Sequence, residues 1–359
     1  DNSFQILGAY TCLLDSIVQT AFDYSFIDIP LIKERLVEEL NHELNYKQKN
    51  LPEKKEKLKL LKEKILEMGK NLESERSSSR EYRYFQEVES QHESETRILE
   101  ERIEELQQLI PQIQDFTNDK NFVLNHLVIF ARGGYGRAEL GLSSDRDLGY
   151  CLDTNRLNNG EAEMLRQLIV HIENLLRNSG VETAHQYFEI DEDLSRFDEV
   201  NTLHTIPSIL ESRVLLGSES LANNLKNRFF QVITFEPYVL NLVRSFSESK
   251  EPELNRMDLK MDYGGLRSLQ IPLWITAATF GIFPSQTADL LAFLIQKHLL
   301  SHRQALKLCQ ALEFLHDLRN FSAVAKEYYF DDEARDIGCV QENLLQDQLN
   351  DSLERLYLC

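Results

Sequence analysis

FARGGYGRAELGLSSDRDLGYCLDT, residues 130–154, joins two apolar runs through a glycine pair and an Asp-Arg-Asp triplet. Glycines at the end of a strand let backbone N–H groups approach a phosphate closely. Aspartates two positions apart on a strand point to the same face of the sheet. The order strand, Gly-Gly, Asp-x-Asp, strand therefore predicts a site for phosphate chemistry that uses a metal ion.

Each part of this segment has an expected role. Gly133 and Gly134 would cradle phosphates, and a short helix or turn from Tyr135 to about Leu142 would add the positive potential of its first N–H groups. The carboxylates of Asp145 and Asp147 are hard oxygen ligands suited to Mg²⁺ or Mn²⁺. The alternative is a plain Gly-Gly turn followed by solvent-exposed aspartates.

The flanking sequence predicts a small α/β domain. Three apolar runs rich in β-branched or aromatic residues are expected to form strands, and one run with helical spacing is expected to form a helix that ends at Gly180. The expected strands are 123–131, 146–153 and 181–190, and the expected helix is 160–178. From about residue 203 onward the pattern is helical, with an interruption at 261–268.

The first 116 residues are expected to be helical, with Pro30 near the start of a helix. Two segments have apolar residues at alternating three- and four-residue spacing, the seam of a coiled coil, and the serine-rich stretch 74–81 separates them. The seam residues are Leu58, Leu61, Ile65, Met68 and Leu72, then Leu99, Ile103, Leu106, Ile110 and Ile113. This pattern predicts an antiparallel helical arm, either a stalk that packs on itself or a surface for a coiled-coil partner or self-association.

The predicted fold class is therefore α+β, with three segments. Residues 1–116 form a helical lead-in and coiled-coil arm, 117–200 an α/β domain, and 201–359 an all-helical domain.

Composition narrows the class of function. The 359 residues carry a formal net charge of −20, which argues against a nucleic-acid duplex as partner but allows a nucleotide in a local pocket. No apolar run approaches the ~20 residues of a membrane span, so no membrane partner is expected. Five scattered cysteines without a C-x-x-C pair fit a reducing, cytoplasmic environment.

Several segments in the same order resemble the protein-PII uridylyltransferases, a family within the DNA polymerase β superfamily of nucleotidyltransferases. They are GGYGRAELGLSSDRDL (133–148), SILESRVLLGSESLANNL (208–225), DLKMDYGGLRSLQIPLWI (258–275) and ALEFLHDLRN (311–320). The resemblance implies a nucleotidyltransferase domain followed by a helical domain that closes over the nucleotide. It implies Mg²⁺-dependent transfer of UMP or AMP from UTP or ATP to an acceptor hydroxyl, on a protein by family analogy.

The resemblance also implies roles for individual residues. Asp145 and Asp147 would be catalytic and would hold the metal, with the phosphates bound by Gly133, Gly134 and Ser144. Arg137 and Glu139 would brace the loop as an ion pair. Lys260 and Arg267 would either reach the phosphates from the helical domain or join the two domains through surface salt bridges.

The sequence also departs from the family pattern. Superfamily members usually have a third carboxylate on a neighbouring strand, and Glu182 is the candidate here, with Glu189 and Asp191 as rivals. Phe188 and Ser268 replace an arginine and an aspartate of the family. The metal-dependent phosphohydrolase domain and the C-terminal sensing modules of the family are expected to be absent. The alternative function is a non-catalytic, nucleotide-binding regulator that acts through the arm.

Overall fold

The structure of the protein is a computed structural model. The structure describes residues 3–72, 79–141, 144–191, 194, 205–232, 235–247, 259–260 and 264–329.

Contacts divide the chain into two compact units. The first consists of Asp1–Phe22, Val123–Asn155 and Ile172–Cys359, and the second of Asp23–Phe122 and Arg156–His171. Helices α1 (Ser3–Ile27) and α6 (Asn159–Asn178) contribute residues to both units. The first 22 residues are thus grouped with the sheet, whereas the division expected from the sequence places them with the arm. The expected division into three segments stays a prediction.

The first unit contains a four-stranded mixed sheet. Its strands are β1 (Leu127–Ala131), β2 (Asp147–Leu152), β3 (Ala184–Glu189) and β4 (Arg213–Gly217), in the order β3-β2-β1-β4. Strand β1 pairs antiparallel with β2 and β4, and β2 pairs parallel with β3. The predicted α+β class is confirmed.

Two local predictions were wrong. Residues 123–126 are not strand but the end of α4 (Lys120–His126), whose start is capped by Asp119 Oδ1 accepting from Asn121 N at 2.9 Å. Strand β4 lies in a stretch expected to be helical. Its pairing partner β1 is about eighty residues away along the chain, so local periodicity does not reveal it.

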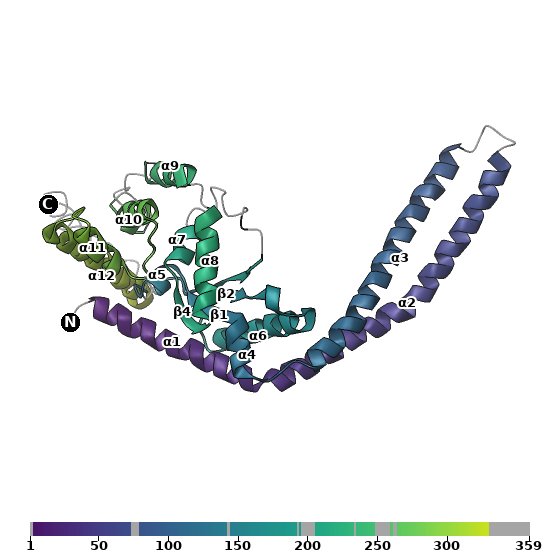
Figure 1. Cartoon of the computed structure of the whole chain (residues 1–359), viewed down its shortest axis with the longest axis horizontal. Coiled ribbons are helices and arrows are strands. Elements are labelled where there is room, and N and C mark those ends of the chain that lie inside the picture. Colours follow the sequence, from purple (N-terminus) through teal and green to yellow (C-terminus); the bar gives the residue numbers. More distant parts are fainter. Residues whose placement is uncertain are drawn as a thin grey trace. The chain divides into compact units, whose positions relative to one another are not determined.

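Helices cover one face of the sheet. Val128, Phe130, Cys151 and Phe188 project from that face into a hydrophobic core that they share with residues of α8 and α10. Figure 1 shows α8 lying across the strands. The helices after β4 are α8 (Glu219–Val232), α9 (Phe235–Ser247), α10 (Leu266–Phe280), α11 (Thr287–Gln296) and α12 (His302–Tyr329), while α7 (Thr205–Leu210) precedes it.

The second unit is dominated by a helical hairpin. Helices α2 (Ile29–Leu72) and α3 (Ser79–Gln114) lie side by side and run antiparallel (Figure 1). Ion pairs join Lys54 to Glu95 at 2.8 Å and Arg102 to Glu43 at 3.1 Å. The seam positions Ile65, Ile103, Leu106, Ile110 and Ile113 are buried. The hairpin is thus present, and coiled-coil packing along it stays a prediction.

None of the helices in the described ranges has the length and apolar character that a membrane span requires.

Candidate active site

A pocket of about 310 Å³ lies in the first unit, where β1 ends and β2 begins. Eight of the nine sequence-predicted site residues line it: Gly133, Gly134, Arg137, Ser144, Asp145, Asp147, Lys260 and Arg267. Glu182 does not line the pocket. The structure therefore gathers residues from three distant segments around the glycine pair and the aspartates.

The glycine turn packs closely against the second aspartate. Gly133 has φ +54°, and a Cβ added there would lie 3.3 Å from Asp147 Oδ2. A Cβ on Gly136 would meet the carbonyl oxygen of Ala131 at 2.8 Å, so no other residue fits there without displacing backbone. The short helix or turn expected from Tyr135 to about Leu142 is a single helical turn that starts earlier, at the glycines, α5 (Gly133–Gly136).

The two aspartates differ in burial. Asp147 opens β2 and its side chain is 33% exposed, whereas that of Asp145 is 70% exposed and lies 3.7 Å from Lys260 Nζ. Burial raises the pKa of Asp147, Arg132 opposes this, and the neighbouring Asp145 raises it further. Two adjacent carboxylates with excess negative charge fit a divalent cation, whose other ligand positions water and phosphate oxygens would fill.

The face of the sheet that carries Phe130 and Phe188 continues into the pocket with three polar side chains, those of Arg132, Asp147 and Gln186. Asp147 is two residues before Gly149 on β2, and Gly149 is in register with Gln186 on β3. Arg132 follows β1, two residues after Phe130, so it lies on the same face. Its NH1 donates to Gln186 Oε1 at 2.7 Å. Neither Arg132 nor Gln186 was predicted from the sequence, although period-two alternation from Phe130 and Phe188 places both on this face.

The candidates for a third carboxylate all lie outside the pocket. Glu182 is exposed and precedes β3, and its backbone carbonyl accepts from Arg146 at 3.4 Å. Glu189 accepts from Tyr187 at 2.7 Å, and Asp191 accepts from Thr154 at 2.5 Å. The residue of β3 that reaches the pocket is Gln186. Among the described residues, no cluster of three or more His, Cys, Asp and Glu side chains could hold a metal.

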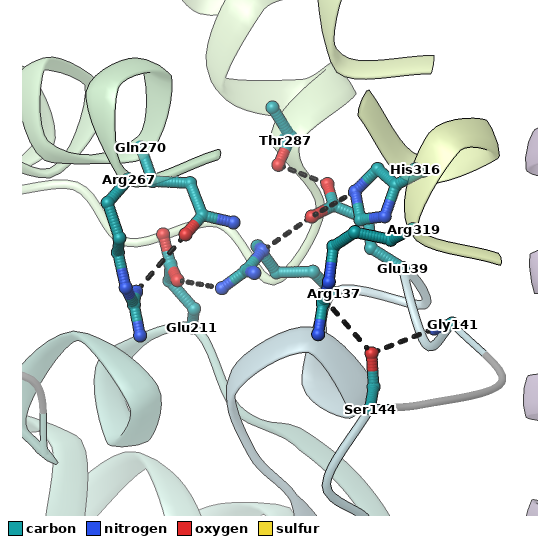
Figure 2. Close-up of polar contacts among 10 residues, drawn as sticks. All are labelled: Arg137, Glu139, Gly141, Ser144, Glu211, Arg267, Gln270, Thr287, His316 and Arg319. Carbon is teal, nitrogen blue, oxygen red and sulfur yellow. Dashed lines mark hydrogen bonds and ion pairs between the residues drawn. The ribbon is translucent and has the colours of Figure 1, made fainter. Parts of the chain in front are cut away.

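A buried polar network fixes the loop after the glycine turn (Figure 2). Arg137 donates to Glu139 at 2.7 Å and to Glu211 at 2.8 Å. The expected ion pair between Arg137 and Glu139 is therefore present, and Glu211 extends it. Thr287 of α11 donates to Glu139, and His316 of α12 lies 3.9 Å from the same carboxylate. Burial raises the pKa of Glu211. Burial also acts to raise the pKa of Glu139, but Arg137, Thr287 and His316 together outweigh it and lower that pKa.

Cations from the later helices complete the pocket. Arg267 donates to Gln270 at 3.1 Å and its guanidinium lies 4.8 Å from the ring centre of Trp274. Burial and the repulsion of Arg137 lower the pKa of Arg267 to about 10. Its Nε is buried without a hydrogen-bond partner in the described part of the chain. Arg319 of α12 lies 3.5 Å from Ser144 Oγ (Figure 2). Cations this close together favour an anionic ligand.

Comparisons with known proteins agree with this geometry. Residues 244–322 match the family model described as GlnD PII-uridylyltransferase. The chain is 30% identical over 165 residues to the bifunctional uridylyltransferase/uridylyl-removing enzyme of Zymomonas mobilis, covering 44% of this chain and 17% of that protein. The resemblance to uridylyltransferases is thus confirmed.

Two further relatives carry the same name. The protein of Ectopseudomonas mendocina is 30% identical over 206 residues, covering 54% of this chain and 21% of its own length. That of Psychrobacter cryohalolentis is 28% identical over 201 residues, covering 54% and 20%. The chain therefore spans about a fifth of the length of the curated relatives it matches.

Proposed function

We propose that this protein is a metal-dependent nucleotidyltransferase. It moves a nucleoside monophosphate, UMP or AMP, from UTP or ATP to an acceptor hydroxyl on a protein. One observation carries the proposal: the glycine turn, both aspartates and four cations from separate elements line one pocket. The similarity of about half of the chain to uridylyltransferases supports the same reaction.

The charges of the pocket suit a triphosphate. The whole chain carries −20 charges, yet the pocket contains Arg132, Lys260, Arg267 and Arg319 in addition to the neutralised Arg137. A local cluster of cations in an acidic protein attracts a small polyanion without attracting nucleic acid in general. Gly133 and Gly134 leave the backbone accessible beside Asp147, where phosphate oxygens would lie.

Asp145 and Asp147 would hold the divalent metal. When bound, the metal would activate the attacking hydroxyl and stabilise the departing pyrophosphate. The residues of the chain would position the phosphates: Ser144 by its hydroxyl, and Lys260 and Arg267 by their charge. Arg137, Glu139 and Glu211 lie behind the turn and would hold it in place.

The nucleotide and the acceptor are proposed from the relatives. Their name favours UTP as donor, and ATP is the alternative. A PII protein, which the matched family model names, is the first acceptor to test, with a tyrosine hydroxyl as the attacking group. A pocket that hydrogen-bonds one base edge rejects another base strongly, because buried polar groups would be left unpaired. We therefore expect a clear preference for one nucleotide.

Transfer can be measured directly. The full chain is incubated with a PII protein, Mg²⁺ and each of the four α-labelled NTPs, and both pyrophosphate and label on protein are followed. The proposal expects release of one pyrophosphate for each label transferred, with one NTP strongly preferred. Asp147→Asn serves as the inactive control. Pyrophosphate release that is equal in the wild type and in this variant would contradict the proposal.

One observation favours a second candidate, the nucleotide-binding regulator that acts through its hairpin. The pocket face of β3 presents the amide Gln186, and Glu182, Glu189 and Asp191 all lie outside the pocket. With no carboxylate of β3 facing the pocket in the described part of the chain, deprotonation of an acceptor would be slow. The regulator binds an NTP with Mg²⁺ and releases no pyrophosphate, so the same assay separates the two functions.

A further inference from the structure

A buried arginine lies at the end of β1, beside the aspartates. Arg132 is 7% exposed. Its Nε donates to the Leu148 carbonyl at 3.1 Å, and its NH1 donates to Gln186 at 2.7 Å and lies 3.5 Å from Ser208 Oγ. Residues of β2, β3 and α7 thus bind two of the three nitrogens of the guanidinium group, Nε and NH1.

The third nitrogen of the guanidinium, NH2, has a weaker interaction. NH2 of Arg132 lies 3.9 Å from Asp147 Oδ1, too far for a hydrogen bond. Burial lowers the pKa of Arg132, but an arginine side chain in a protein stays protonated. A buried cation that hydrogen-bonds only neutral groups is incompletely neutralised. An anionic ligand in the pocket would supply the missing partner.

We infer that Arg132 contacts the phosphates of the substrate, donating from NH2 to a triphosphate oxygen beside the Gly133–Gly134 turn. This inference rests on the proposed nucleotide-binding function. With Nε and NH1 already hydrogen-bonded, NH2 can still donate, and a charged N–H donor bonds more strongly to an ionised phosphate oxygen than to the neutral acceptors of a base edge or a sugar hydroxyl. Gln186 and Ser208 are positioning residues, because they act on the substrate only by holding Arg132.

The neutral partner at position 186 is important for this role. The amide oxygen of Gln186 orients the guanidinium and leaves its charge available. A carboxylate at the same position would pair with Arg132 and add a negative charge beside the phosphates. We therefore expect Gln186→Glu to weaken nucleotide binding. If position 186 instead needed a carboxylate as a metal ligand, the same substitution would strengthen it.

The test compares ligands that differ only in phosphate number. The full chain binds UTP, UDP, UMP or uridine in the presence of Mg²⁺, with the matching adenosine series measured in parallel, and titration calorimetry gives each Kd. Arg132→Gln removes one charge, and Arg177→Gln removes the same charge from an exposed site on α6 that does not line the pocket. For Arg132→Gln we expect the Kd for the triphosphate to rise about tenfold or more. The rise should shrink with each phosphate removed and vanish for the nucleoside, and Arg177→Gln should change nothing.

Several results would overturn the inference. Unchanged triphosphate affinity in Arg132→Gln contradicts the contact. A loss that is equal for triphosphate and nucleoside places Arg132 at the base or in the fold instead. If Arg132→Gln does not fold, Gln186→Glu decides, because an unchanged or tighter triphosphate Kd in that variant contradicts the inference. A wild-type chain that binds no NTP overturns the proposed function itself, and this inference with it.

Discussion

Arg137 in the turn after α5 and Glu211 at the end of α7 are joined by a 2.8 Å hydrogen bond between NH1 and Oε2, with both side chains buried. The same arginine binds Glu139 through Nε. One cation therefore bridges two buried carboxylates that are 72 residues apart in the sequence (139 and 211). This arrangement anchors the glycine turn to the segment that leads into β4.

Substitution of this arginine should destabilise the fold strongly. Arg137→Met leaves Glu139 and Glu211 buried without their counterion, and removing one partner of a buried ion pair typically costs about 3–5 kcal/mol. Urea denaturation measures the free energy of unfolding. Arg177→Met, at an exposed position, is the matched control and should lose less than about 1 kcal/mol. Similar small losses in both variants would mean that the network does not anchor the turn.

The paired aspartates should matter for activity and not for stability. Because burial and the neighbouring carboxylate raise the pKa of Asp147, the fold disfavours its charged form at neutral pH. Asp147→Asn should therefore keep or raise the melting temperature while abolishing transfer, and Asp145→Asn should abolish transfer with little change in stability. Thermal unfolding and pyrophosphate release are measured on the same samples. A variant with a much lower melting temperature and unchanged activity would show that the two aspartates stabilise the fold and do not take part in transfer.

His316 should give the protein a specific sensitivity to acid. Burial lowers the pKa of His316 from 6.5 to about 4, so the unfolded chain binds a proton in this window that the folded chain does not. The folded state favours the neutral form of His316, so the free energy of unfolding is unaffected by this histidine above pH 6.5 and decreases as the pH falls toward 4. The free energy of unfolding of His316→Gln should therefore fall less across this window than that of the wild type, by at most about 3 kcal/mol.

The control for this pH series is His302→Gln, which changes an exposed histidine at the start of the same helix. It should follow the wild type at every pH. If His316→Gln also follows the wild type, the histidine does not couple protonation to folding.

The hairpin should be separable from nucleotide binding. Lys54 and Glu95 pair across α2 and α3, so a short Gly-Ser linker can join them and replace residues 55–94. The remaining parts of both helices keep their antiparallel arrangement. We expect this shortened protein to stay folded and to keep the wild-type Kd for Mg²⁺–NTP. Circular dichroism and calorimetry check both points. A large loss of nucleotide affinity would show that the outer hairpin takes part in the site.

The sequence allowed prediction of those site residues whose chemistry is encoded locally. The Gly133–Gly134 pair and the Asp145–Asp147 pair are each close in sequence, and the strands on either side of them follow from their apolar runs. The ion pair of Arg137 with Glu139 was expected from the family resemblance, and the structure contains it. Lys260 and Arg267 were placed by family resemblance alone.

The remaining site depends on neighbours that only the folded sheet brings together. Arg132 and Gln186 meet because β2 pairs with both β1 and β3, and that register is not encoded in either strand alone. Glu182 was expected to open this strand at a position where the family tends to have an acid, but the strand starts at Ala184 and leaves Glu182 exposed. Glu211 was missed because its partner, Arg137, lies in another segment.

The most direct test of the account is the dependence of nucleotide binding on metal. Titration calorimetry measures the Kd of UTP and of ATP for the full chain, once with Mg²⁺ and once with EDTA, for the wild type and for Asp147→Asn. Without metal, Asp145 and Asp147 repel the triphosphate at close range, so we expect wild-type affinity to fall at least about tenfold in EDTA. Asp147→Asn should lose most of this metal dependence. Equal affinity with Mg²⁺ and with EDTA in the wild type would contradict a metal-bridged nucleotide site.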